Sequence, residues 1–179
     1  IFIKLAYAAH PVDAITLLML RMLYAAPLFG AIAWWASRAR GAAPMTRADW
    51  RLLAGLGFIG YYLSSLLDFL GLQYISASLE RLILFLYPTF VVLLSAWWLR
   101  APVTRRAVGA LLLSYGGIAL AFWHDLRITG DAVATLTGGG LVLGASVLYA
   151  AYLVQAGGII ARVGSLRFVA WAMLASTSF

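Results

Sequence analysis

Long apolar runs alternate with short polar breaks along the whole chain, and this pattern predicts helices that cross a membrane. A helix needs about 20 residues to span the hydrocarbon core of a bilayer. Runs of about this length cover 14–37, 50–72, 76–99, 104–123 and 137–161. Shorter apolar runs at 1–9 and 165–179 are expected to belong to two further helices, the first of them truncated. The predicted fold is an all-α, polytopic transmembrane helix bundle.

The amino-acid composition fits a bilayer environment and does not fit a water-soluble fold. Hydrophobic residues make up 64% of the 179 residues and charged residues 11%, whereas soluble domains contain about 45–50% apolar and about 25% charged residues. The sequence contains no cysteine, and His10 and His124 stand far apart without another histidine or acid at metal-ligand spacing. A transition metal needs several such ligands. We therefore predict no metal site and no cofactor.

The positive charges are concentrated in alternate polar breaks, and the formal net charge is +7. One set of breaks carries Arg38, Arg40, Arg47, Arg51, Arg100, Arg105, Arg106, Arg162 and Arg167. The opposite set carries Arg127 together with Asp13, Asp125 and Asp131. Because basic loops tend to stay in the cytoplasm, the arginine-rich loops are predicted to be cytoplasmic. Basic residues spread between apolar runs do not form a phosphate-binding patch, so nucleic acid is not an expected partner.

Four charged residues fall inside the predicted spans: Arg21, Asp68, Glu80 and Arg81. A lone charge near the bilayer centre costs about 2.5–3.5 kcal/mol, so four unpaired charges would cost on the order of 10 kcal/mol. At about 1.5 Å per residue, all four lie roughly 6–10 Å from the outer ends of their helices. Two positive and two negative charges at similar depth are expected to meet inside the bundle. The cluster is either a water-accessible pathway or gate, or a structural ion-pair lock.

Tyrosines at helical spacing extend the charged faces of the predicted helices: Tyr24, Tyr61 and Tyr87. They either line a cavity or pack between helices. Pro88 removes a backbone donor in the middle of the run 76–99 and predicts a kink there. The kink either lets the helix flex around a substrate or improves the packing as a fixed bend.

Short stretches rich in small residues, Pro and Gly follow one another along the chain: Leu20-Arg21, 72–78 (LQYISAS), 87–90 (YPTF), 103–106 (VTRR) with Gly109-Ala110, and 115–120 (YGGIAL). Their order resembles the EamA-like members of the drug/metabolite transporter superfamily. The resemblance implies ten helices in two inverted five-helix repeats. Residues 1–123 would then be the first repeat, with a truncated opening helix, and 137–179 the start of the second, so the chain would be a fragment.

The resemblance also implies a function: a secondary transporter that exports small metabolites or drugs by alternating access across a bacterial plasma (inner) membrane. Its cavity would lie between the repeats. The resemblance adds two tyrosines of the second repeat, Tyr149 and Tyr152, to the candidates. The candidate cavity or gate residues are then Arg21, Tyr24, Tyr61, Asp68, Glu80, Arg81, Tyr87, Pro88, Tyr149 and Tyr152. The chain departs from the family at 99–102 (LRAP), where members often carry an acid in a Gly-Glu-Arg-like turn. No role of that acid is carried over.

Proton coupling is a hypothesis for this transporter, because an acid whose proton affinity changes during transport, Asp68 or Glu80, would couple the two fluxes. Two other function classes stay open: a non-transporting sensor or assembly subunit, and an intramembrane enzyme that uses Glu80 and Arg81. The enzyme is not expected, because no His, Cys or second carboxylate lies nearby in the sequence. The expected partners are the lipid bilayer, a small-molecule substrate, protons and a second copy of the chain in a homodimer.

Overall fold

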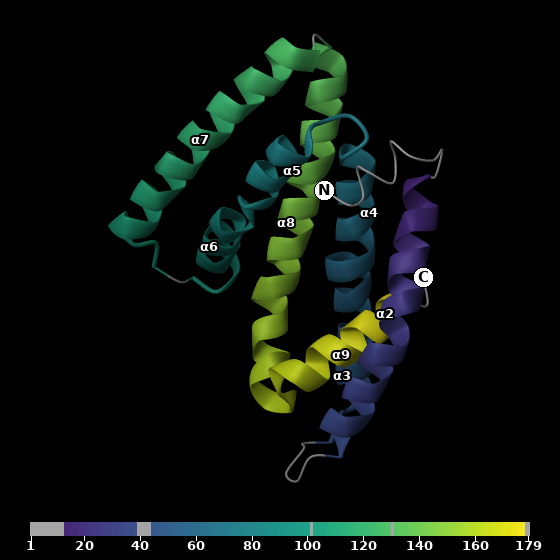
Figure 1. The fold of residues 1–179 in the computed structure, drawn as a ribbon. Coiled ribbons are helices and arrows are strands. Elements are labelled where there is room, and N and C mark those ends of the chain that lie inside the picture. Colours follow the sequence, from purple (N-terminus) through teal and green to yellow (C-terminus); the bar gives the residue numbers. More distant parts are fainter. Residues whose placement is uncertain (1–12, 39–43, 101, 130, 178–179) are drawn as a thin grey trace.

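The computed structural model describes residues 13–38, 44–100, 102–129 and 131–177, and every regular element in these ranges is a helix (Figure 1). Within these ranges, some segments are long and apolar enough to cross a membrane: Ala14–Ser37, Arg47–Gly71, Ala77–Trp98 and Ala132–Val163. The prediction of a polytopic all-α bundle is thereby confirmed. The predicted truncated helix at 1–9 lies outside the described residues.

Several helices are regular along their whole length: α2 (Ala14–Ser37), α7 (Arg105–Thr129), α8 (Ala132–Val163) and α9 (Ser165–Ser176). Acidic side chains fix the starts of two of them. The Asp13 carboxylate accepts a hydrogen bond from the backbone N–H of Thr16, 3.1 Å away, at the start of α2. Hydrogen bonds from the side chain and backbone of Thr16 hold the pKa of Asp13 below its ordinary value of 3.8. Asp131 caps α8 in a similar way, so this helix begins earlier than the predicted run 137–161.

The other two membrane-length segments are divided by local changes of helix geometry. The first consists of α3 (Arg47–Gly57), a π-helical segment η1 (Phe58–Leu63) and α4 (Ser64–Gly71). The second consists of α5 (Ala77–Leu84) and α6 (Tyr87–Trp98). Both divisions lie next to the residues that the sequence marked as candidates for a site.

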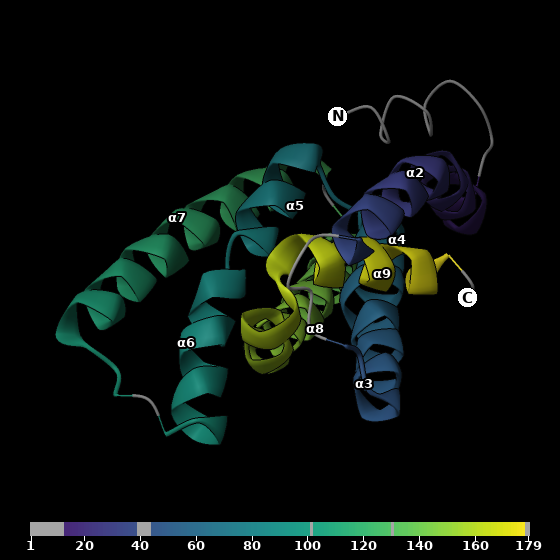
Figure 2. The ribbon, with the colours of Figure 1, turned by 90° about the horizontal axis from the view of Figure 1, so that it is seen from below.

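Helix α8 runs through the middle of the bundle and packs against α4, η1, α5 and α6 (Figure 1). Helix α9 packs against α2 and α3 (Figure 2). Helix α7 stands apart on the outer side of α5 and α6, and its contacts are with α5 and α8. The predicted run 104–123 falls in α7, where the apolar stretch found among the described residues is the shorter Val108–Leu120.

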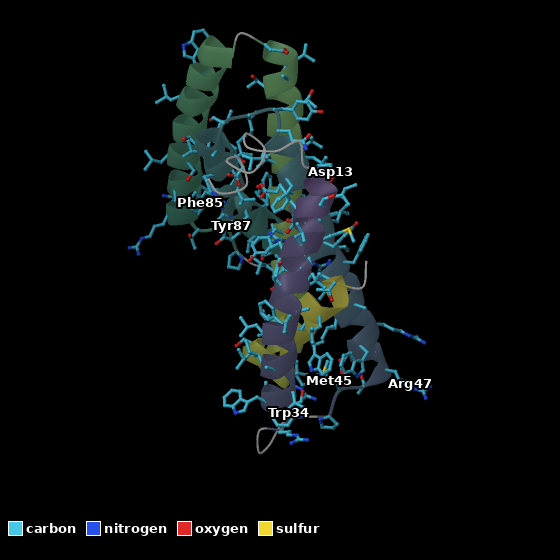
Figure 3. All side chains as sticks on the ribbon, turned by 45° about the vertical axis from the view of Figure 1, so that its right-hand side comes forward. Asp13, Trp34, Met45, Arg47, Phe85 and Tyr87 are labelled. Atoms are coloured by element: carbon cyan, nitrogen blue, oxygen red, sulfur yellow. The ribbon has the colours of Figure 1, made fainter. Side chains whose placement is uncertain are left out.

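The chain reverses direction at successive breaks, so the ends of several helices gather at each end of the bundle. The end of α2, the start of α3 and the end of α8 lie together at one end of the bundle (Figure 1). We call it the arginine-rich end for the residues that it carries: Arg38, Arg47, Arg51 and Arg162. Figure 3 shows Trp34, Met45 and Arg47 at this end, and Phe85 and Tyr87 nearer the opposite end.

Buried apolar side chains pack these helices together in separate clusters. One cluster joins α3, α8 and α9 near the arginine-rich end and includes Leu53, Ile159 and Phe168. Another joins α2 to α4 around Phe69. A third joins α5 to α8 and includes Val142. Between these clusters lies the charged region described next.

Candidate functional site

The membrane segment made of α5 and α6 is interrupted near Pro88, at residues 85–86, and a serine from α8 contributes to the support of the break. Proline has no N–H, so it leaves a backbone carbonyl one turn earlier without its helical partner. The Ser146 hydroxyl of α8 lies 3.1 Å from the carbonyl oxygen of Ile83 and 3.4 Å from that of Leu84. The Ile83 carbonyl also accepts from the backbone N–H of Leu86 at 3.0 Å, and the Ser146 hydroxyl lies 3.1 Å from the Val142 carbonyl of its own helix as well, so Ser146 is one of several groups that hold the break. The sequence predicted a kink at Pro88, and the structure has a full break between two helices.

Arg21 of α2 reaches across to α4, although the residue is exposed. Its guanidinium donates a hydrogen bond to the Ser65 hydroxyl at 2.7 Å and lies over the Phe69 ring, 5.0 Å from the ring centroid. Asp68 is close enough to act on its charge. A charge inside a membrane protein is expected to face such partners rather than lipid. These contacts hold the guanidinium against α4 at the edge of the bundle, while Arg21 itself stays exposed, which differs from the interior position predicted from the sequence.

Glu80 of α5 is an unusual buried acid, since it is 1% exposed. The Nε of Arg81 lies 3.2 Å from its Oε2, but without hydrogen-bond geometry. Among the described residues, neither Glu80 oxygen nor Oδ1 of Asp68 has a hydrogen-bond partner, although the two acids act on each other electrostatically. Removing an ion from water costs several kcal/mol unless hydrogen bonds replace those of water. Among the described residues, Arg81 and Arg21 supply positive charge near this pair of acids.

The charges border a cavity of about 490 Å³ between α2, η1, α4, α5, α6, α8 and α9. This volume lies in the range of about 300–1,000 Å³ that is usual for small-molecule sites. Its lining includes six of the residues predicted from the sequence: Arg21, Tyr61, Asp68, Arg81, Tyr87 and Tyr149. The cavity therefore offers charges of both signs together with aromatic surface.

Four tyrosines from three elements form one wall of this region. The Tyr61 and Tyr152 hydroxyls are 2.9 Å apart, and their ring centroids are 5.1 Å apart. Tyr149 stacks on Tyr152 at 5.7 Å and meets Tyr87 edge-on at 5.3 Å. Each such ring pair contributes about 0.5–1.5 kcal/mol beyond its buried area. The wall joins η1, α6 and α8 into one rigid surface.

The π-helical segment η1 sets the position of this wall. A Cβ placed on Gly60 would lie 2.4 Å from Cγ of Tyr152, so only glycine permits the contact. A π-helical turn inserts an extra residue and turns the following side chains relative to a regular helix, and it occurs often at functional sites. Tyr61 is thereby directed at Tyr152.

The remaining predicted residues occupy different surroundings. Glu80 lies buried beside Asp68, and Tyr152 is buried in the tyrosine wall. Tyr24 is 80% exposed and Pro88 is also exposed, and neither is in the cavity lining. The roles of all ten residues in transport or gating stay predictions.

Sequence reasoning missed several residues that shape the site. Gly60 and Ser146 look like ordinary small residues of a membrane helix, and only the structure shows what they touch. Asp49 could have been found locally, because Thr46 and Asp49 have the spacing of a capping box. Its ion pair with Arg162, 113 residues away, has no local signal.

The cavity lining carries both charged and aromatic groups. Its described lining supplies guanidinium, carboxylate and phenol groups. Among the described residues, no three His, Cys, Asp or Glu side chains gather as metal ligands would. Charges of both signs beside a flat aromatic wall suit a small polar molecule with an apolar body.

These features define a multi-pass membrane protein with a charged cavity between its helices. Residues 1–123 match the EamA-like transporter family, and the chain belongs to this family. It is 34% identical, over 184 aligned positions, to the "Uncharacterized transporter YcbK" of Bacillus subtilis (strain 168). The alignment covers 98% of this chain and 55% of that protein, so the chain spans about half the length of this relative. No solved structure matches the chain.

Proposed function

We propose that the full-length protein is a secondary transporter that exports small metabolites or drugs across the bacterial plasma membrane by alternating access. Membership of the EamA-like transporter family supports this proposal, as does the cavity between the helices. In this proposal, 1–123 form the first of two inverted repeats and 137–179 begin the second. The arginine-rich end faces the cytoplasm, in keeping with the distribution of basic residues.

The observation that carries the mechanism is the pair of acids beside the cavity. No donor in the described part of the chain reaches the buried carboxyl of Glu80, which lies near Asp68, a residue of the cavity lining. Two neighbouring carboxyl groups that lack donors satisfy each other best when they share one proton. A substrate that changes the charge of the cavity would change how strongly that proton is held. We propose that this linkage couples export to protons.

The test begins by finding a substrate, through drug- and metabolite-resistance profiling of cells that express the full-length protein. The compound found is then followed in proteoliposomes with an imposed pH gradient. The native protein is expected to follow the gradient. Glu80→Gln and Asp68→Asn should exchange the compound without responding to the gradient, because a neutral side chain cannot release a proton.

The matched control is Asp13→Asn, which removes an acid outside the cavity and should keep the response to the gradient. If Glu80→Gln and Asp68→Asn both follow the gradient as the native protein does, these acids have no coupling role. If no compound in the profile is transported by the native protein, the transporter proposal itself fails.

A further inference from the structure

One ion pair outside the cavity joins distant parts of the chain at the arginine-rich end. Asp49, in the first turn of α3, accepts a hydrogen bond from Arg162, in the last turn of α8. Asp49 is 4% exposed. Its second oxygen accepts hydrogen bonds from the backbone N–H and the hydroxyl of Thr46, each at 2.7 Å. Because both oxygens are bonded, the carboxylate is held in one position.

A second polar contact connects two more helices at the same end. Trp171 of α9 donates a hydrogen bond from Nε1 to the Ser37 hydroxyl of α2, at 3.1 Å. Its ring also meets the ring of Trp50 edge-on, with centroids 4.9 Å apart. Trp50 follows Asp49 directly in α3. Helices α2 and α3 are therefore tied to α8 and α9 at one level of the bundle.

Apolar packing fills the space between these contacts and the cavity. Leu53, Ile159 and Phe168 are buried there in one cluster. The backbones of α3 and α9 approach so closely that a Cβ on Gly57 would lie 2.7 Å from the carbonyl oxygen of Ala172. The cavity is thereby closed toward the arginine-rich end.

The ion pair combines a fixed acid with a base that water can reach. The Arg162 side chain is 49% exposed, so water can replace Asp49 as its partner. Ion pairs with this much access to water are individually weak. Asp49 keeps its bonds to Thr46 when Arg162 leaves. The pair can therefore open without disturbing the start of α3.

We propose that the Asp49–Arg162 pair is a latch that is closed in this conformation and must open before the cavity communicates with the arginine-rich side. This inference rests on the proposed alternating-access function. The Trp171–Ser37 contact and the apolar packing separate when the latch opens. The conformation described here is the one in which that side is shut.

The test follows the access of a thiol reagent to the cavity, so it needs no substrate. The sequence contains no cysteine, and Met173 lines the cavity. Met173→Cys in a cysteine-free full-length protein is labelled with a membrane-impermeant maleimide, added to right-side-out and to inside-out vesicles. Arg162→Gln should raise labelling several-fold from the arginine-rich side and not from the other. Arg162→Lys keeps the charge and should stay close to the parent.

The sidedness and the lysine variant separate a latch from a structural contact. Loosening of the whole fold would raise labelling from both sides, and that result would overturn the proposal. Equal labelling of the parent and Arg162→Gln from the arginine-rich side would also overturn it. Efflux of the profiled compound is measured separately on the parent. Failure of efflux would count against the transporter function, whereas unchanged labelling in a protein that transports would count against the latch alone.

Discussion

Asp49 and Glu80 are both buried acids, 4% and 1% exposed, and each has an arginine beside it. Asp49 receives hydrogen bonds at both oxygens, from Thr46 and Arg162. Glu80 receives none from the described residues. The two acids are thus buried to nearly the same extent, but only the carboxyl oxygens of Asp49 accept hydrogen bonds from described residues. Burial therefore does not distinguish the two acids. Their hydrogen-bond partners do: the acid with donors holds helices together, and the acid without them is the one proposed to bind and release a proton.

The position of each acid in its helix explains the difference. Asp49 is the third residue of α3, where its side chain returns to the cap residue Thr46 and closes a capping box. Helix α5 is capped by Ser76, which accepts from the backbone N–H of Leu79 at 3.1 Å. Glu80 comes one residue later than a capping box requires, so its carboxyl faces the neighbouring helices instead. One residue of register thus places one acid in a cap and the other in the interior.

The largest effect on stability is expected at Gly60. This residue lies between the region of Asp49 and that of Glu80, where the cavity borders the apolar cluster of α3, α8 and α9. Gly60→Ala forces a Cβ against the Tyr152 ring, and such overpacking costs about 1–3 kcal/mol. Gly55→Ala, in the same membrane segment, meets nothing within 4 Å and should stabilise by about 0.5–1 kcal/mol, because glycine disfavours helices. Thermal unfolding in detergent micelles compares the two. Equal midpoints would contradict the close contact of Gly60 with the Tyr152 ring.

A smaller effect on stability is expected at Ser146. Its hydroxyl donates to buried acceptors on the cavity side, as Thr46 and Arg162 donate to Asp49. Ser146→Ala removes a donor to the Leu84 carbonyl, while the Ile83 carbonyl keeps its hydrogen bond from the Leu86 N–H, and the loss of one intramolecular hydrogen bond costs about 0.5–1.5 kcal/mol. The Ser114 hydroxyl of α7 is exposed and bonds within its own helix, to Ala110. Ser114→Ala should change stability by less than about 0.5 kcal/mol. Matching losses in the two variants would remove Ser146 from the support of the break near Pro88.

The smallest effect on stability is expected at Asp13. Its carboxylate accepts a hydrogen bond but is exposed, so this residue shows the effect of hydrogen bonding without that of burial. Its pKa is lowered by Thr16, so the cap stabilises the protein above the ordinary pKa of 3.8 and this contribution is lost as the pH falls through the lowered value. Asp13→Asn keeps a good cap without a titrating group. The unfolding midpoint of the native protein minus that of Asp13→Asn should be flat above about pH 5 and should decline below the ordinary pKa. A flat difference at all pH values would contradict the cap.

The membrane helices were predictable because their cause is local. A bilayer of fixed thickness requires apolar runs of about 20 residues, and the predicted run 14–37 coincides with α2. The meeting of Arg21, Asp68, Glu80 and Arg81 was also predictable, since isolated charges are too costly in lipid. The structure differs in one respect, because Arg21 and Arg81 gather at the cavity but stay exposed.

The finer features were not predictable because they depend on contacts between distant segments. Nothing near Gly60 in the sequence signals a π-helical turn, and Ser146 acquires its role from a break on another helix. Helical spacing placed Tyr24 one turn from Arg21, but the side chain is 80% exposed. Spacing says which residues share a helix face, and packing decides which part of that face lines a cavity.

The central claim is that a buried acid with hydrogen-bond donors stabilises the fold, whereas a buried acid without them does not stabilise it and serves function instead. It is tested most directly by the unfolding midpoints of Asp49→Asn and Glu80→Gln in detergent micelles at neutral pH. Asp49→Asn should lower stability by on the order of 1 kcal/mol, because it weakens a half-exposed ion pair. Glu80→Gln should leave the midpoint unchanged or raise it, because it removes a buried acid that no donor among the described residues reaches, and the new amide can donate to Asp68. A midpoint that falls as far for Glu80→Gln as for Asp49→Asn would contradict the account.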